Sequence, residues 1–444
     1  MAAITRIAEF ITQTDVPKDA LVVVRSAFLD TVGCTLAGSV EPAARIVQKL
    51  AASEAGSGSS RILGTELSVN AGWAALANGT AAHALDYDDM CFVSLAHPSA
   101  PLVSALLALG EKTGAPGRTL LEAYVIGFEV EAVLGRVMNP RHYQSGWHCT
   151  STIGTLGSSA ACARLLSLDA KATANCMAIA ASSALGLKEN FGTMTKPLHA
   201  GVAAQNSVMA ALLAQSGFTA SERAIDGPQG LLVAMTGEHL DGREIFADLG
   251  RRWEILETGI TVKLYPSCAA THPALDAVLH LRREHELKPD QVESVEVQVD
   301  SIVPTLLIYN QPQAGLEGKF SMPFCIAAAL VDGQVGLDTF ELRIHDAAIR
   351  ELMARVVMKT NPALGKDAPA LTQVMVSITC RDGRKLQRAA NNARGYPENP
   401  ASEEELKTKF ITCAQRAITL TAAEIVYEQL RNFESIANLN QLAS

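Results

Sequence analysis

The long stretch before residue 265 is rich in alanine and other small or apolar residues and poor in charge, and this composition constrains the fold most. Residues 197–221 contain no Asp, Glu, Lys or Arg, and residues 152–163 are mostly Gly, Ser, Thr and Ala. Helices that are apolar on every side belong inside a protein. Small side chains also let neighbouring helices lie close together. The sequence therefore predicts a bundle of closely packed helices, with residues 152–163 near its centre.

The pattern changes after about residue 265. Residues 291–300 and 371–380 alternate apolar and polar side chains, which is typical of strands with one buried face. Asp382-Gly383, just after the second of these segments, is a hairpin signal. Helices are expected around the strands at residues 272–286, 320–331 and 346–355.

Helical patterns return near the carboxyl end, where Ser402 and Glu405 form a capping box that starts a helix. A chain of 444 residues is long enough for more than one domain. We therefore predict a multidomain α and α+β protein. A large all-helical bundle domain is built from both chain ends, residues 1–265 and 401–444. A smaller α+β domain, residues 266–400, is inserted between these two parts.

The overall charge argues against several classes of partner. The chain has 37 Lys and Arg against 46 Asp and Glu, a net charge of −9, and no basic run. A surface for nucleic acid or for an anionic membrane is therefore not expected. The nine cysteines are scattered without a C-x-x-C pair, which predicts reduced thiols and a cytoplasmic location.

Residues 83–99 concentrate charge in these apolar surroundings. Asp86, Asp88 and Asp89 precede a His-Pro pair at 97–98, in a chain with only 19% charged residues. Such charges are costly unless they are paired or used. The carboxylates could bind Mg²⁺, although no second acidic motif is found. They could form the solvated end of a helix, on which Asp86 and Asp89 share a face. Alternatively, a carboxylate lies beside cations or a substrate.

Isolated cations and histidines elsewhere favour the last explanation. Lys196 precedes the uncharged segment 197–221, and Lys263 lies where the composition changes. His148 directly precedes the expected small-residue helix, and helix N-termini attract anions. Taken alone, each of these residues, like His97, has a structural explanation. Together they predict a site between domains for a substrate with two or three carboxylates, rather than a metal site.

These residues occur in segments that resemble the MmgE/PrpD family. The matching segments are Ala84-Leu-Asp-Tyr-Asp-Asp89, His97-Pro-Ser-Ala100, Gly146-Trp-His-Cys-Thr-Ser151, Gly154-Thr-Leu-Gly157, Lys196-Pro-Leu-His-Ala-Gly201 and Lys263-Leu-Tyr-Pro-Ser267. The resemblance implies a helical domain built from both chain ends, a smaller α+β domain, an active site between them and a homodimer. It also implies a metal-free, cofactor-independent enzyme that acts on di- or tricarboxylates. Activities in the family include 2-methylcitrate dehydratase, cis-aconitate decarboxylase and iminodisuccinate epimerase.

The resemblance carries an active-site set over to this chain, namely Asp86, His97, His148, Lys196 and Lys263. Lys196, Lys263 and His148 are expected to bind substrate carboxylates, whereas His97 and Asp86 are expected to shape the proton-transfer site. Two positions depart from the cis-aconitate decarboxylases of the family. Cys268 lies in the segment where those enzymes have a His, and Met90 stands where they carry a Thr, which argues against cis-aconitate as the substrate.

Three functional hypotheses follow. The first is a dehydratase-type lyase, because most known chemistry of the family is of that kind. The second is an epimerase of an amino- or hydroxy-polycarboxylate such as iminodisuccinate. An epimerase needs two groups on opposite faces of the reacting carbon, and Tyr143, Lys196 and Cys268 are candidates for them. The third is a helical scaffold without catalytic activity.

Overall fold

The computed structural model describes residues 3–366 and 372–443, which form two compact units. The helical unit comprises the chain up to Ala84, Asp88–Val262 and the chain from Ser402 onward. The α+β unit comprises Lys263–Ala401 and the short segment Leu85–Tyr87. The predicted division of the chain placed this short segment in the helical domain together with its neighbours. The protein is thus of mixed α and α+β class, as predicted.

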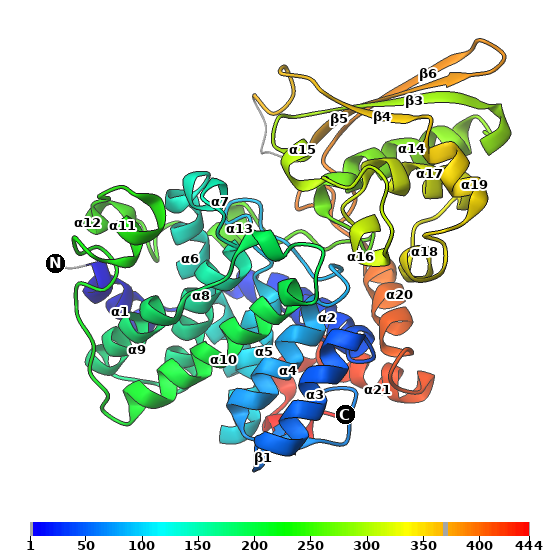
Figure 1. Ribbon diagram of the computed structural model, residues 1–444. Helices are drawn as coiled ribbons and strands as arrows, with labels where there is room; N and C mark the ends of the chain where they lie inside the picture. Colours follow the sequence, from blue (N-terminus) through cyan, green and yellow to red (C-terminus); the bar gives the residue numbers. More distant parts are fainter. Residues whose placement is uncertain (1–2, 367–371, 444) are drawn as a thin grey trace. The chain divides into compact units, whose positions relative to one another are not determined.

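The helical unit is built from long helices that come from both ends of the chain (Figure 1). Its longer helices are α1 (Ala3–Gln13), α2 (Lys18–Gly38), α3 (Pro42–Glu54), α4 (Ala71–His83), α5 (Ser99–Thr113), α6 (Gly117–Met138), α8 (Cys149–Leu165), α9 (Ala170–Ser183), α10 (Thr195–Gln215), α20 (Glu403–Ala414) and α21 (Leu420–Arg431). Short helices and strands complete it: α7 (Arg141–Gln144), α11 (Leu231–Thr236), α12 (Gly242–Ile245), α13 (Glu254–Glu257), β1 (Ser57–Arg61) and β2 (Ser68–Val69).

Helices α4, α5 and α8 are buried on nearly every side, and α10 packs against all three of them with one side. In α8, every residue except Arg164 is buried, which agrees with the small side chains of its sequence. Among the described residues, one helix, α2, is long and apolar enough to cross a membrane, and 78% of its most apolar window is buried inside the unit. A core helix of a bundle has the same composition.

Helices α4 and α10 cross in direct backbone contact. A Cβ atom on Gly201 would lie 2.3 Å from the carbonyl oxygen of Leu76, and one on Gly79 would lie 2.8 Å from Cα of Gly201. Only glycine fits at such a crossing. The last residue of α4, His83, and the second residue of α10, Lys196, lie about one turn from this point. The crossing therefore sets how close these two side chains lie.

The α+β unit has a four-stranded sheet in the order β4-β3-β5-β6. Its strands are β3 (Val292–Val299), β4 (Val356–Thr360), β5 (Gln373–Cys380) and β6 (Lys385–Asn391). β3 pairs with β4 in parallel and with β5 antiparallel, and β5 and β6 form the predicted hairpin. Leu371, in the predicted second strand, lies outside the described residues. β4 was not predicted, because its short sequence does not alternate regularly.

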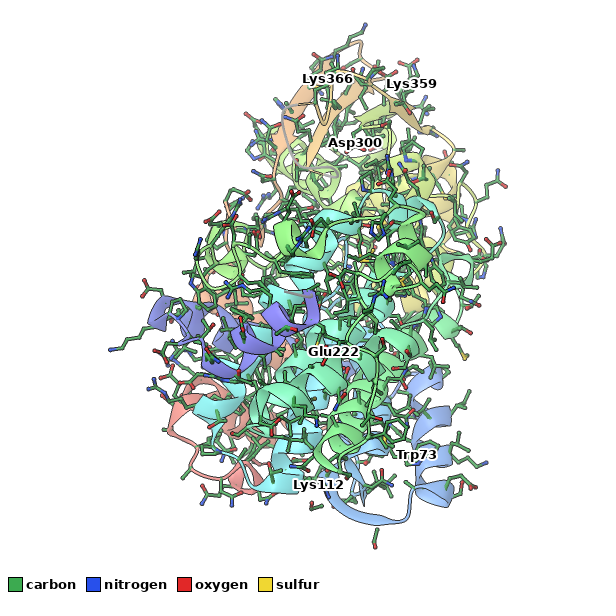
Figure 2. All side chains as sticks on the ribbon, turned by 90° about the vertical axis from the view of Figure 1, so that its left-hand side faces the viewer. Trp73, Lys112, Glu222, Asp300, Lys359 and Lys366 are labelled. Atoms are coloured by element: carbon green, nitrogen blue, oxygen red, sulfur yellow. The ribbon has the colours of Figure 1, made fainter. Side chains whose placement is uncertain are left out.

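Helices cover one face of this sheet, as Figure 1 shows. They are α14 (His272–Glu284), α17 (Met322–Asp332) and α19 (Ala347–Met353), with the short α15 (Val303–Leu306), α16 (Gly315–Gly318) and α18 (Leu337–Leu342) nearby in the chain. The apolar side chains of β3 and β5 are buried in alternation. Charged side chains such as Lys359 and Lys366 of this unit, and Lys112 and Glu222 of the helical unit, are exposed (Figure 2).

Two local predictions were wrong, and one alternative explanation is excluded. Residues 84–98 are not helical, so Asp86 and Asp89 do not share a helical face; Asp86 has a left-handed backbone with φ of 52°, which cannot continue a helix. The three carboxylates are not a solvated helix end either, because Asp86 is 5% exposed and Asp88 and Asp89 are 0% exposed. Lys196 does not precede its helix but lies in the first turn of α10.

Candidate active site

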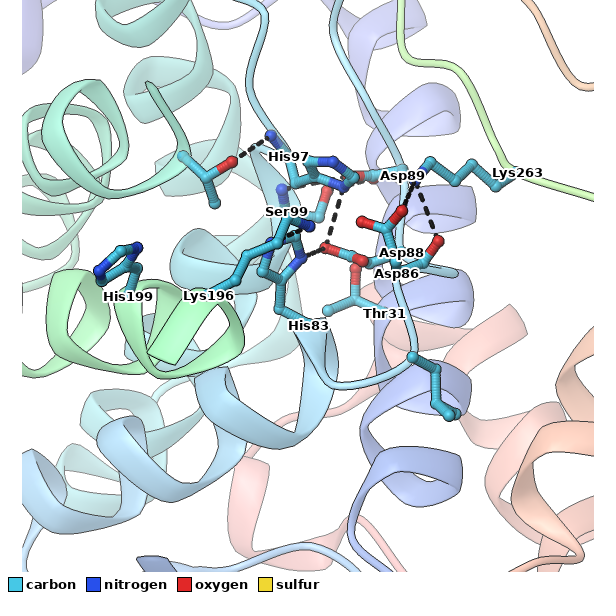
Figure 3. Close-up of polar contacts among 12 residues, drawn as sticks. Thr31, His83, Asp86, Asp88, Asp89, His97, Ser99, Lys196, His199 and Lys263 are labelled. Carbon is cyan, nitrogen blue, oxygen red and sulfur yellow. Dashed lines mark hydrogen bonds and ion pairs between the residues drawn. The ribbon is translucent and has the colours of Figure 1, made fainter. Parts of the chain in front are cut away.

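A chain of hydrogen bonds joins α4, the loop after it and α10 in the helical unit (Figure 3). Nδ1 of His83 lies 2.8 Å from Oδ2 of Asp88, and Nε2 of His83 lies 3.0 Å from Nζ of Lys196. Nδ1 of His97 approaches the same carboxylate oxygen at 3.3 Å. Lys196, His83 and Asp88 therefore form a continuous polar path within an otherwise apolar bundle.

Burial and the neighbouring groups together set the charge of these groups. Burial lowers the pKa of His83 to about 4. The nearby Lys196 also lowers this pKa, whereas Asp88 raises it. Burial alone would raise the pKa of Asp88, but His83 and His97 hold it well below its usual range. Asp88 is thus a carboxylate and His83 is a neutral ring at neutral pH. A carboxylate only accepts hydrogen bonds, so His83 carries its proton on Nδ1 and presents the lone pair of Nε2 to Lys196.

His97 is held by its backbone as well as by Asp88. Its backbone N–H donates to Oγ1 of Thr150 in the first turn of α8, at 3.0 Å. Because Pro98 follows it, the backbone of His97 is biased away from the helical conformation. The ring of His97 meets that of His83 edge-on, with centroids 4.5 Å apart. These contacts place the His97 ring beside the path from Lys196 to Asp88.

His148 stands at the start of α8 and faces the same cluster. It is the N-cap residue of this helix, and its ring stacks on that of His83 with centroids 5.7 Å apart. Its Nδ1 lies 3.0 Å from Nδ1 of His199 on α10. Burial and the charge of Lys196 lower the pKa of His199 to about 4 and that of His148 well below its usual value. Both rings are therefore neutral at neutral pH.

One group of side chains in the described residues is close enough to hold a metal ion. Its members in the helical unit are His83, Asp88 and His97, whose ligand atoms lie within 4.8 Å of one another. A metal needs a ring nitrogen with a lone pair that is not already engaged. Both ring nitrogens of His83 are engaged, and the amine of Lys196 lies 3.0 Å from one of them. His83 would therefore have to give up one of these two hydrogen bonds to bind a metal ion.

Asp89, next to Asp88, turns away into a different environment. Its carboxyl oxygens accept hydrogen bonds from the backbone N–H of Ser99, at 3.2 Å, and from the Ser99 hydroxyl. The same hydroxyl lies 2.5 Å from Oη of Tyr124. Burial, followed by the charge of Asp30, raises the pKa of Asp89 well above its usual value. Asp89 is thus part of the packing of the bundle rather than of the cluster around Lys196.

Two of the predicted residues pair within the α+β unit. Nζ of Lys263 lies 3.2 Å from Oδ2 of Asp86 and donates to the Asp86 carbonyl oxygen at 3.0 Å (Figure 3). Lys319 donates to the carbonyl oxygen of Leu85. These contacts hold the segment Leu85–Tyr87 in this unit and fix the left-handed backbone of Asp86. Cys268 belongs to the same unit and is partly exposed.

The structure thus brings together three of the predicted residues in the helical unit, His97, His148 and Lys196. Tyr143 lies in α7, where its ring faces Nζ of Lys188 at 3.5 Å. From the sequence, Asp88 was named among three candidate carboxylates but was not chosen, and His83 and His199, which belong to the cluster, were missed. His83 opens the segment 83–99, and its spacing of five residues from Asp88 was the available signal.

Comparison with known proteins shows the family of this chain. The model of the MmgE/PrpD N-terminal domain matches residues 3–242, and that of the MmgE/PrpD C-terminal domain matches residues 265–433. A cis-aconitate decarboxylase of Homo sapiens is 26% identical over 432 residues, which cover 94% of this chain and 88% of that protein. One of Mus musculus is 28% identical over 83% of this chain and 78% of that protein. One of Aspergillus terreus is 24% identical over 90% of this chain and 86% of that protein. The chain belongs to the MmgE/PrpD family.

Proposed function

We propose that this protein is a metal-independent lyase of the dehydratase type that moves a proton next to a carboxylate of a di- or tricarboxylic acid. The observation that carries this proposal is the hydrogen-bonded path from Lys196 through His83 to Asp88. The family and the cis-aconitate decarboxylase relatives support an enzyme of the lyase or dehydratase type. The substrate class follows from the cationic and hydrogen-bonding groups around the path.

Lys196 is the proposed group that exchanges a proton with the carbon beside the carboxylate. In its amine form it takes the proton, and Nε2 of His83 accepts a hydrogen bond from the resulting ammonium. Asp88 holds His83 in the tautomer that allows this, and its negative charge favours added positive charge along the path. A positioned acid or base of this kind contributes roughly 10²–10⁴-fold to a rate.

The negative charge that develops on the substrate needs hydrogen-bond donors. His148 lies at the N-terminus of α8, where helix N–H groups and the dipole favour anions. A donor at its ring would stabilise the enolate-like charge on the carboxylate. His97 is the proposed acid that protonates a leaving hydroxyl, because its ring lies beside that of His83. Removing a proton at one carbon and a hydroxyl at the next yields an alkene.

A second candidate is an epimerase, and one observation favours it. Of the nine cysteines, all of which the structure describes, only Cys268 is partly exposed while the others are buried. A thiol with access to solvent can donate or accept a proton, as an epimerase requires of a second group. Met90 and Cys268 are also the two departures from the cis-aconitate decarboxylases, which favours a different polycarboxylate.

The test is proton NMR of the enzyme in D₂O with 2-methylcitrate, citrate, cis-aconitate or iminodisuccinate, with and without EDTA. We expect new vinyl signals from one hydroxy acid, unaffected by EDTA. Deuterium entering a C–H beside a carboxylate, with interconverting stereoisomers and no alkene, would establish the epimerase instead. No exchange with any compound at high enzyme concentration would refute both proposals.

The variant Lys196→Met should lower turnover by roughly 10²–10⁴-fold, because it removes the proposed proton-transfer group but keeps the length of the side chain. Lys409→Met is the matched control. Lys409 is also a nearly buried lysine of the helical unit, paired with Asp30 at 2.5 Å. Its loss should lower the melting temperature but leave turnover intact below that temperature. Equal turnover losses in both variants would discard the role of Lys196.

A further inference from the structure

The contact between His148 and His199 joins two neutral rings, and only one of them can supply the proton. Their Nδ1 atoms lie 3.0 Å apart. A neutral imidazole carries one proton, so the ring that donates from Nδ1 has a bare Nε2, and the ring that accepts at Nδ1 has its proton on Nε2. The direction of this one hydrogen bond therefore decides whether His148 offers a donor or an acceptor to a ligand.

The surroundings of His148 fix the position of its ring. Its backbone N–H donates to the carbonyl oxygen of Gly186 at 3.0 Å. Its ring is packed between His83, on which it stacks, and the edge of Phe191, with centroids 5.7 and 4.9 Å away. Among residues 3–366 and 372–443, its Nδ1 bonds to His199 and no group bonds to its Nε2. Nε2 is thus the atom left for a ligand.

His199 is equally well held. It lies on α10, one turn after Lys196, and the whole residue is 5% exposed. Its carbonyl oxygen accepts a hydrogen bond from Oγ of Ser151 on α8, at 3.1 Å. Gly186 packs against the same ring, since a Cβ there would lie 3.4 Å from Cγ of His199. His199 therefore cannot turn away from His148 without disturbing the junction of α8 and α10.

We infer that His199 donates its Nδ1 proton to Nδ1 of His148, so that His148 presents an Nε2–H group to a carboxylate of the substrate. The anion-attracting start of α8 and the neighbouring Lys196 favour this direction, because a negatively charged ligand in front of Nε2 stabilises a donor there. His199 is thus a positioning residue that acts through His148. The inference rests on the proposed function for the identity of the ligand.

The direct test is the tautomer of His148, read by ¹⁵N NMR of enzyme labelled at histidine, with the His148→Gln spectrum used for assignment. We expect the His148 proton on Nε2 in the unaltered enzyme. In His199→Phe, which keeps an aromatic ring but no donor, we expect a mixture of tautomers. In His199→Asn, whose amide nitrogen can donate from nearly the same place, the Nε2–H form should return. An Nδ1–H form in the unaltered enzyme would overturn the inference.

Ligand binding gives a second readout. Tricarballylate, a tricarboxylate without a leaving hydroxyl, is the probe, and calorimetry measures its affinity. A mixture of tautomers weakens binding by the inverse of the fraction that keeps the Nε2 proton, so we expect a loss of about 2- to 10-fold in His199→Phe, with recovery in His199→Asn. In turnover, KM should rise more than kcat falls. An effect on kcat alone, with unchanged affinity, would contradict the inference.

His142→Phe is the matched control for a purely structural effect. His142 is also buried, with a pKa lowered to about 4, and its ring bonds to Thr152 of α8 at 3.0 Å. This variant removes a buried imidazole of α7 that packs against α8 but leaves the contact between His199 and His148 in place. It should leave the His148 tautomer unchanged. If the enzyme shows no turnover with any polycarboxylate yet keeps the tautomer and affinity pattern, the proposed function fails and the role of His199 stands.

Discussion

Asp88 and Asp89 are adjacent in sequence and equally buried, yet they belong to two regions with opposite electrostatics. Asp88 faces His83 and His97, and these rings hold its pKa well below the usual value in spite of burial. Asp89 faces Ser99 and Tyr124, and burial together with Asp30 raises its pKa well above the usual value. Burial is the same for both carboxyls, so the partners decide which of them is charged.

This contrast shows how a helical bundle can contain a reactive cluster without losing its core. On the side of Asp88, the polar groups are joined in a path that ends at the amine of Lys196. On the side of Asp89, the carboxyl stays neutral and hydrogen-bonds to the hydroxyl of Ser99, which in turn contacts that of Tyr124. Burial and the nearby Asp89 also raise the pKa of Glu131. The region around Asp88 is suited to transferring a proton, whereas the carboxyl of Asp89 retains its proton.

Replacing each carboxyl by an amide tests whether the two regions differ in function. Asp88→Asn should lower kcat by roughly 10²–10⁴-fold, because an amide can hold His83 in the wrong tautomer. Asp89→Asn should leave kcat nearly unchanged, because the amide is uncharged like the protonated acid and its oxygen can still accept a hydrogen bond from Ser99. Steady-state kinetics of the two variants with the substrate found by NMR checks this. Equal losses would show that the two regions are not distinct.

The pH dependence of stability should separate the two regions next. A carboxyl whose folded pKa is raised gives stability that is complete below its unfolded pKa of about 3.8 and is lost as pH rises through the folded pKa. Relative to Asp89→Asn, the unaltered protein should therefore lose melting temperature as pH rises from about 4 to 8. Calorimetry across this range provides the measurement. A constant difference between the two proteins would mean that Asp89 is charged in the fold throughout.

The smallest expected effect concerns Tyr124. Its hydroxyl lies 2.5 Å from Oγ of Ser99, which also bonds Asp89. Tyr124→Phe removes one buried hydrogen bond and should cost about 1 kcal/mol of stability, with kcat unchanged. Chemical denaturation and kinetics measure the two quantities. A clear loss of kcat would link the Asp89 region to the reaction after all.

Much of the fold could be predicted from local patterns. The Ala-rich helices and the alternating strands were found within a few residues, because the 3.6- and 2-residue periods of apolar side chains mark them directly. The strand β4 was missed, since it is short and its burial depends on β3 beside it. For the segment 84–98, the expected helical face was wrong, whereas the expectation of a carboxylate beside a cation agrees with the pairing of Asp86 with Lys263, which lies 177 positions away.

The candidate site was predicted only in part, because its residues were visible in the local sequence but their partners were not. His97, His148 and Lys196 stood out as isolated polar residues in apolar surroundings. Their partners could not be assigned, since His83 meets Lys196 only after α4 and α10 have packed, 113 positions apart in the chain. His199 looked like one more residue of an uncharged helix until its ring was seen against His148.

The backbone contact of Gly79 with Gly201 gives the cluster a mechanical setting. Two rigid rods touch there without intervening side chains, and the reactive groups lie one turn beyond the point of contact. A side chain added at that point would push the two helices apart, which would lengthen the distance between Nε2 of His83 and Nζ of Lys196. The alignment of a reaction would then be tuned by two residues that have no side chain and never meet the substrate.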